Sequence, residues 1–317
     1  MIKNESDILD YIQAKINTKS PNVVKSIGDD CAVIRISNKQ SFVITTDTSL
    51  EGPHFTKDYT AFEIGYKSLS TNLSDIAAMG CIPKYIFMSL TLPKLNTNWI
   101  KSFYKGIATH VAKFNLALIG GDTNRGPLSI SIQVIGINKS KVLYRNGANL
   151  NDDIYVSGKL GLARAALILK NKKKFIKEFN ILKKYLHMPI PRIDAGLKLS
   201  KLANSCIDIS DGLMKDLSSI IRQSNCGAEI YLERIPTHRL LKKLIPSSKY
   251  YECLIGGGED YELCFTASKS KRKNIQLIAK NLKLPLTVIG KVTKKNILFK
   301  ENGFEKKLNI KGFDHFS

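Results

Sequence analysis

The sequence predicts an α+β protein, organised as two α/β domains in which helices pack on mixed β-sheets. Its 317 residues are long for a single hydrophobic core and suit two domains of about 150 residues each. Near-continuous apolar segments of strand length alternate with segments whose apolar residues recur at helical spacing. This alternation starts again after the polar stretch 138–141, which is therefore the predicted junction between the domains.

Residues 1–137 are expected to alternate helices and strands. An amphipathic helix should begin near the N-terminus with Ser6 as its N-cap. Thr60 and Glu63 have the spacing of a capping box, which predicts a helix that runs towards Met79 and stops at Gly80. The other elements predicted for this half are a helix over Thr97–Phe114 and strands at Cys31–Ser37, Ser41–Asp47, Lys84–Leu92, Leu116–Ile119 and Leu128–Ile137.

The second half is expected to begin with a strand at Asp153–Ser157, followed by Gly158–Gly161 and a helix. A lysine-rich helical region comes next, then a helix over Ile193–Ala203, an I-D-I-S-D-G turn and a helix that ends near Asn225. The remaining predicted strands, with a helix between the second and the third, are Ala228–Leu232, Tyr261–Ala267, Leu286–Val292 and Ile297–Lys300.

The bulk composition excludes several classes of protein. A hydrophobic content of 43% is ordinary for a globular chain, and no apolar run approaches the ~20 residues that cross a bilayer. The N-terminal residues include several acidic ones and lack the apolar core of a signal peptide. The cysteines are scattered and form no C-x-x-C pair, which favours reduced thiols over a zinc site. We therefore expect a cytoplasmic protein.

The strong positive charge raises a second hypothesis, a nucleic-acid-binding module. Lys and Arg number 49 against 27 Asp and Glu, a formal net charge of +22. The lysines cluster with Asn and Ile on predicted helix faces, and no zinc-finger spacing or aromatic-rich basic strand accompanies them. We interpret the charge as a surface bias that attracts anionic substrates, and we predict that nucleic acid is not a partner.

The aspartates are more informative than the net charge. Each of them lies beside Gly, Ser, Thr or a short apolar run, as at a strand end or turn that holds a side chain at a fixed point. They are Asp29 and Asp30 in I-G-D-D-C-A-V-I, Asp47 in I-T-T-D-T, Asp75 in N-L-S-D-I-A-A-M-G, Asp122 in I-G-G-D-T-N-R-G-P, and Asp208 and Asp211 in I-D-I-S-D-G. Carboxylates buried together repel unless cations neutralise them, and hard divalent cations prefer oxygen ligands. The pattern predicts one Mg²⁺-dependent site that handles phosphates.

Each motif also has a plainer structural interpretation when it is considered alone. Thr45 and Thr46 fit ordinary strand positions, and Asp47 fits a cap. The segment Gly120-Gly121-Asp122 fits a simple turn as well as a backbone loop that approaches a phosphate.

Two further aspartate motifs leave similar alternatives. Asp75 lies inside a helical pattern, where a cap or a salt bridge to Lys67 or Lys84 would account for it. A helix cap explains either Asp208 or Asp211 but not both. The chain has no G-x-x-x-x-G-K-[ST], strand-linked G-x-G-x-x-G, H-R-D or D-F-G motif, so a P-loop or protein-kinase solution is excluded while phosphoryl transfer is not.

Taken together, the motifs resemble those of the bacterial thiamine-monophosphate kinase (thiamine-phosphate kinase) family. The resemblance extends from about Ile27 to the closing K-G-F-D-H-F. Its motifs are I-G-D-D-C-A-V-I, T-T-D-T-S-L-E-G-P-H-F, G-Y-K-S-L-S-T-N-L-S-D-I-A-A-M-G, L-I-G-G-D-T-N-R-G-P, R-N-G-A-N-L-N-D-D-I-Y-V-S-G, A-N-S-C-I-D-I-S-D-G-L and G-G-E-D-Y-E-L-C-F-T, in that order.

This resemblance implies the fold of the aminoimidazole ribonucleotide synthetase superfamily. An N-terminal domain over residues 1–138 would bind ATP and Mg²⁺ and pair into a homodimer, and a C-terminal α/β domain over residues 139–317 would complete the active site. The implied Mg²⁺ ligands are Asp30, Thr45, Thr46, Asp47, Asp75, Asp122, Asp208 and Asp211. The implied ATP contacts are Tyr104, Gly121, Asp122, Arg145 and Ser210, and the implied thiamine contacts are His54, Glu259 and Phe313.

The implied reaction converts ATP and thiamine phosphate into ADP and thiamine diphosphate, with several Mg²⁺ ions and ATP as co-substrate. Because the nucleophile is an anionic phosphate oxygen, we expect no catalytic His or Ser. The obstacle is repulsion between two phosphates, about 4 kcal/mol per charge pair at ~4 Å and an effective dielectric constant of 20, which bridging Mg²⁺ ions and Arg145 would offset. The alternative is another ATP-dependent synthetase of the same superfamily, with a different pocket around His54, Glu259 and Phe313.

Overall fold

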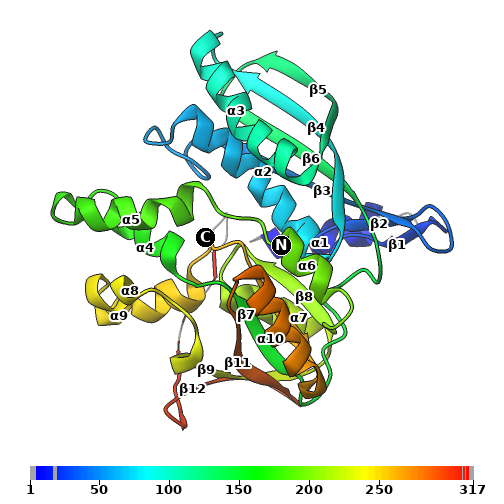
Figure 1. The fold of residues 1–317 in the computed structure, drawn as a ribbon, viewed down its shortest axis with the longest axis vertical. Helices are drawn as coiled ribbons and strands as arrows, with labels where there is room; N and C mark the ends of the chain where they lie inside the picture. Colours follow the sequence, from blue (N-terminus) through cyan, green and yellow to red (C-terminus); the bar gives the residue numbers. More distant parts are fainter. Residues whose placement is uncertain (1–4, 17–19, 309, 311, 314–317) are drawn as a thin grey trace.

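The computed structural model describes residues 5–16, 20–308, 310 and 312–313. Within them the chain forms two mixed β-sheets, one in each half of the molecule, with helices packed against both (Figure 1). The predicted α+β class, with helices on mixed sheets, is therefore confirmed. The strands of the two sheets fall on either side of residues 138–152, and a domain boundary between residues 138 and 139 stays a proposal.

The first sheet has the strand order β1-β2-β3-β6-β4-β5. Its neighbouring strands are antiparallel except for β4 and β5, which run parallel and are joined through a helix. The edge strand β5 is exposed along its whole length. The strands are β1 (Val23–Lys25), β2 (Ala32–Arg35), β3 (Ser41–Leu50), β4 (Ile82–Leu92), β5 (Ala117–Arg125) and β6 (Ser129–Ile137).

Two long helices pack on this first sheet. They are α2 (Ala61–Ala78) and α3 (Thr97–Phe114). The predicted capping box is confirmed, since the Thr60 hydroxyl accepts from the Glu63 amide and the Glu63 carboxylate accepts from the Thr60 amide. Helix α3 has the predicted bounds, because Asn96 caps its first turn and Asn115 ends it in the left-handed conformation, with φ of 50°.

The second sheet has the strand order β13-β12-β9-β11-β7-β10-β8. Neighbouring strands are again antiparallel, with one parallel pair, β9 and β12. Strands β7, β10 and β8, which form one end of this sheet, are buried along their whole length. The strands are β7 (Asp153–Ser157), β8 (Ser205–Ile209), β9 (Gly227–Tyr231), β10 (Glu262–Ala267), β11 (Leu286–Thr293), β12 (Ile297–Glu301) and β13 (Phe304–Glu305).

Helices surround the second sheet, and one further helix lies at the N-terminus. They are α1 (Glu5–Ile16), α4 (Leu162–Leu169), α5 (Ile176–His187), α6 (Ile193–Leu199), α7 (Leu213–Gln223), α8 (Arg239–Leu244), α9 (Ser247–Tyr251) and α10 (Arg272–Leu282), with a π-helical turn at Glu252–Gly256. Helix α2 links the two halves, because it contacts α6, β8 and β10 of the second half as well as its own sheet (Figure 1). Among the described residues, no helix is both long and apolar enough to span a membrane.

The structure corrects several predicted elements. Helix α1 begins at Glu5, so Ser6 lies inside its first turn and is not the N-cap. Strand β5 does not stop at Ile119, because its backbone stays paired with β4 as far as Arg125. The predicted turn at I-D-I-S-D-G begins only after Ile209, since Asp208 is still a strand residue paired with β10. Helix α6 ends four residues before the predicted end at Ala203.

Candidate functional site

A cleft of about 820 Å³ lies between the two halves of the molecule. Its walls come from the segment before β2, from β3, from one face of α2, and from the segments that follow β8 and the π-helical turn. Most of the residues that the sequence predicted as functional line it. They are Asp30, Thr45, Thr46, Asp47, His54, Asp75, Arg145, Asp208, Ser210, Asp211, Glu259 and Phe313.

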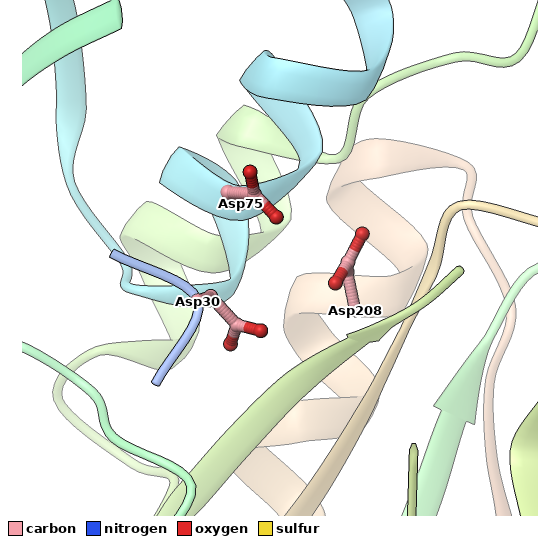
Figure 2. A group of neighbouring side chains, drawn as sticks. All are labelled: Asp30, Asp75 and Asp208. Carbon is pink, nitrogen blue, oxygen red and sulfur yellow. The ribbon is translucent and has the colours of Figure 1, made fainter. Parts of the chain in front are cut away.

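Three of these aspartates form the acidic centre of the cleft. Carboxylate oxygens of Asp30, Asp75 and Asp208 lie within 4.8 Å of one another. Figure 2 shows the three side chains converging from the segment before β2, from α2 and from β8. Such a cluster of oxygens is the arrangement that a hard divalent cation prefers. We refer to these three residues below as the carboxylate triad.

Neighbouring groups fix the triad without satisfying all of its oxygens. The hydroxyl of Thr45 donates to Asp75 over 2.6 Å, and that of Ser74 donates to Asp208 over 2.7 Å. The Arg145 guanidinium donates two hydrogen bonds to one oxygen of Asp30, the shorter of them 2.6 Å long. The second oxygen of Asp30 is buried and has no hydrogen-bond partner among the residues that the structure describes. A bound cation would provide that missing partner.

The electrostatics of the triad also favour a cation. Burial raises the pKa of all three carboxyl groups. Repulsion within the triad and from Asp47 raises the pKa of Asp75 and Asp208 further, and the charge of Asp29 does so for Asp30. Arg145 acts in the opposite direction on Asp30 and Asp208. A raised carboxyl pKa means that the surroundings do not compensate the negative charge of the ionised group. The triad therefore fits Mg²⁺, which would supply positive charge where it is missing.

A second acidic group lies beside the triad. Asp47 projects from the same face of β3 as Thr45, and burial raises its pKa, as does the negative charge of Asp211. The backbone amide of Asp47 donates to Asn72 of α2 over 3.2 Å. Thr46 lines the cleft as well, but its hydroxyl accepts a hydrogen bond from Gln133 of β6. Asp47 and Asp211 thus extend the acidic region beyond the triad.

The other end of the cleft has a different chemistry. His54 closes a turn after β3, where its Nδ1 accepts from the Leu50 amide over 3.1 Å. Lys67 of α2 lies beneath this turn and forms an ion pair with Glu259. Tyr59 lies next to them, with its ring stacked at 3.5 Å on that of His187. This end combines aromatic rings with a carboxylate, which suits an organic cation.

Three predicted site residues lie outside the cleft. Tyr104 is on α3, where its ring contacts Phe103, and Gly121 and Asp122 are on the exposed strand β5. Asp122 accepts hydrogen bonds from its neighbours on that strand. Asp47 and Asp122 are separated by β6 and β4, which places them about 14 Å apart across the sheet. The structure therefore does not bring these three residues to the cleft of their own chain.

The cleft also contains residues that the sequence analysis did not select. Lys67 and Thr71 lie eight and four residues before Asp75 on α2, so all three share one face of the helix. That helical spacing was a signal in the sequence that could have revealed them. Tyr261 also lines the cleft, and its backbone has the left-handed φ of 48°. No spacing in the sequence indicates this position.

Comparison with protein families gives two matches that together span most of the chain. Residues 28–138 match the family model of the AIR synthase related protein N-terminal domain. Residues 151–300 match the model of the AIR synthase related protein C-terminal domain. The first matched region contains strands β2 to β6 of the first sheet, and the second contains strands β7 to β11 and most of β12 of the second sheet.

Individual relatives match over nearly their whole length. The thiamine-monophosphate kinase of Buchnera aphidicola subsp. Acyrthosiphon pisum is 42% identical over 316 residues, which cover 95% of this chain and 98% of the relative. The thiamine-monophosphate kinase of Escherichia coli K12 is 38% identical over 309 residues, with 96% and 95% covered. The solved structure of AaThiL complexed with AMPPCP and TMP superposes with a TM-score of 0.85, at 31% identity, and covers 98% and 97%.

Proposed function

This chain belongs to the thiamine-monophosphate kinase family, and we propose that it uses ATP to phosphorylate thiamine monophosphate to thiamine diphosphate by direct in-line transfer. The observation that carries the proposal is the triad Asp30–Asp75–Asp208, buried in a cleft between the two halves. A kinase whose acceptor is itself a phosphate must bring two anions together. It therefore needs concentrated positive charge more than it needs a general base.

We propose that the triad, together with Asp47 and Asp211, holds several Mg²⁺ ions. When bound, these ions neutralise the phosphates of both substrates and favour in-line attack. Thr45 and Ser74 keep the triad carboxylates oriented through their hydrogen bonds. All of the side chains in this site act by binding and orienting, and no side chain transfers a proton.

Arg145 has a separate part in the proposed site. Its guanidinium is fixed by Asp30, and its backbone amide donates to Asp29 over 3.2 Å. Asp30 and neighbouring carboxylates raise the pKa of Arg145 further, so its positive charge is permanent. We propose that Arg145 and Ser210 contact ATP, while His54, Glu259 and Phe313 contact the thiamine moiety at the opposite end.

We also propose that the protein is a homodimer that pairs along β5. This edge strand is exposed throughout and presents Leu118 and Ile119, next to Tyr85 and Phe87 of β4. An uncovered strand with apolar side chains is a surface for pairing with another copy. Such pairing would bring the Tyr104, Gly121 and Asp122 of one copy towards the cleft of the other. Sedimentation of an Ile119→Glu variant tests this, because a dimer of unchanged stability contradicts pairing along β5.

The proposed reaction is tested by incubation with MgATP and a panel of phosphorylated vitamins and ribonucleotides, read by mass spectrometry. We expect thiamine diphosphate from thiamine monophosphate and none from free thiamine. Phosphorylation of a ribonucleotide instead would favour another synthetase of the superfamily. Asp47→Asn should abolish turnover with the fold intact, and normal turnover in that variant would remove Asp47 from the proposed metal ligands.

Nucleic-acid binding stays a competing hypothesis for the basic surface. A retardation assay with DNA and RNA at two salt concentrations tests it, because binding through phosphate contacts weakens steeply as salt rises. We expect no specific complex at physiological ionic strength.

A further inference from the structure

We propose that Lys67 is a positioning residue for the organic end of the substrate. In this inference, which rests on the proposed function, Lys67 holds the Glu259 carboxylate and the His54 turn in the geometry that receives thiamine. It would act through these two groups and not by touching the reacting phosphates.

Lys67 and Asp75 lie at opposite ends of the cleft wall that α2 forms. Lys67, Thr71 and Asp75 follow one another at intervals of four residues and all line the cleft. Eight residues of helix correspond to about 12 Å along its axis. The carboxylate triad therefore marks one end of this wall, and Lys67 marks a second end that lies beyond the reach of its ions.

Lys67 is buried, with 4% of its surface exposed, and its ammonium group is surrounded by partners. It donates to the backbone carbonyl of His54 over 3.0 Å and lies 3.5 Å from the Tyr59 hydroxyl. It also forms an ion pair with Glu259, which belongs to the other half of the molecule. A buried ammonium persists only where such groups compensate its charge. Lys67 is thus the point at which three segments of the cleft wall are joined.

Glu259 is held in an unusual backbone conformation that needs this support. Its φ is +74°, in the left-handed region that non-glycine residues rarely adopt. Its amide donates to the Ser210 carbonyl over 2.7 Å, and a side chain on the preceding Gly258 would collide with the same carbonyl. Strained conformations persist where the surrounding structure fixes them, and they cluster in ligand sites. The Lys67 ion pair fixes the side chain as the Ser210 contact fixes the backbone.

The chemistry of thiamine monophosphate matches this two-ended cleft. The molecule has an anionic phosphate at one end and a thiazolium ring with a permanent positive charge in its middle. Oxygen Oε2 of Glu259 is buried against Lys67, while 30% of the Glu259 side chain remains exposed. The exposed part faces the cleft, where it attracts the thiazolium. Without Lys67 the carboxylate would lose its fixed orientation, and the His54 turn would lose one of its anchors.

The test is Lys67→Met, which keeps the length and packing of the side chain but removes its charge and its hydrogen bonds. KM and kcat are measured separately for thiamine monophosphate and for MgATP. We expect KM for thiamine monophosphate to rise about tenfold or more, with KM for ATP within about twofold of the wild type. Lys67→Arg, which keeps the charge, should recover most of the affinity. The matched control is Lys300→Met, whose lysine pairs with Glu229 outside the cleft, and it should behave as the wild type.

A double variant separates a folding defect of Lys67→Met from its effect on substrate binding. If Lys67→Met is poorly folded, the double variant Lys67→Met/Glu259→Gln removes the uncompensated carboxylate. The rise in its KM should then be smaller than the product of the two single effects, because both changes disrupt the Lys67–Glu259 pair and only the loss of the His54 contact is added. Independent, multiplying effects in the double variant would overturn the inference, as would a folded Lys67→Met with an unchanged KM for thiamine monophosphate. A wild-type protein that makes no thiamine diphosphate would instead contradict the proposed function itself.

Discussion

Replacement of Asp208 by asparagine should stabilise the metal-free protein while it removes activity. The three triad carboxylates lie within 4.8 Å of one another. Two unit charges at that distance repel by about 3 kcal/mol at an effective dielectric constant of 20. The folded wild type must either bear this repulsion or keep Asp208 protonated, and both cost free energy on folding. Asparagine avoids that cost and keeps an oxygen that can accept the Ser74 hydroxyl, which lies 2.7 Å from Asp208. We expect the free energy of unfolding at neutral pH to rise by about 2–3 kcal/mol, and Tm by several degrees.

The difference in unfolding free energy between Asp208→Asn and the wild type should increase with pH. Burial, with the negative charge of Asp30, raises the pKa of Asp208 from 3.8 to about 8. A carboxyl group with a raised folded-state pKa binds its proton more tightly in the native protein, so deprotonation above its unfolded pKa destabilises the fold. The wild type should therefore lose stability relative to Asp208→Asn as the pH rises from about 4 to about 8.

Thermal unfolding with EDTA and with excess MgCl₂ measures both effects. The wild type should be stabilised by Mg²⁺, by about 2.7 kcal/mol when the ion is at 100 times its Kd. Asp208→Asn should gain much less, because a ligand has been lost. A variant that is less stable than the wild type in EDTA would refute the repulsion argument, and an equal gain from Mg²⁺ would remove Asp208 from the metal site.

Three further predictions concern stability away from the cleft. Burial lowers the pKa of His110 to about 4. The stability that the neutral His110 side chain contributes is therefore present above pH ~6.5 and lost as the pH falls through ~4. In His110→Gln the free energy of unfolding should fall by about 3 kcal/mol less over this pH range, measured from denaturation midpoints against pH. Thr60→Ala removes the capping box with Glu63 and should cost about 1 kcal/mol in urea unfolding, while the exposed Lys57→Ala should not. Gly106→Ala places a methyl group against a backbone carbonyl of α2 and should lower Tm by more than Thr60→Ala does. An unchanged Tm would show that α2 and α3 can move apart without loss of stability.

The bounds of an element could be predicted from the sequence where the residues that fix them are close to it in the sequence. Helix α3 was predicted with its final bounds because its cap, its apolar spacing and its stop are all local. Strand β5 was cut short because Gly120, Gly121 and Asp122 look like a turn, and only the pairing with β4 keeps them extended. An exposed edge strand has no apolar alternation to reveal its length.

The candidate site could be predicted by residue type but not by position. The sequence selected the triad aspartates from their flanking residues, yet their convergence depends on how α2 contacts β8 across the two halves. It offered Lys67 as a salt-bridge partner for Asp75, whereas the fold pairs Lys67 with Glu259 and leaves Asp75 to Thr45. Long-range pairs of this kind leave no trace in spacing. Ion-pair partners are therefore the least predictable part of the site.

The triad and the two ion pairs act on the halves of the molecule in opposite directions. Asp30 and Asp75 belong to the first half and Asp208 to the second, so without a cation their repulsion opposes closure of the cleft. Arg145, in the segment between the two sheets, attracts Asp30, and Glu259 of the second half attracts Lys67 of the first, and both ion pairs oppose that separation. A bound cation changes the central repulsion into attraction between the halves. The two ion pairs can therefore hold the empty cleft close to its closed geometry, which reduces the reorganisation that substrate and metal binding must bring about.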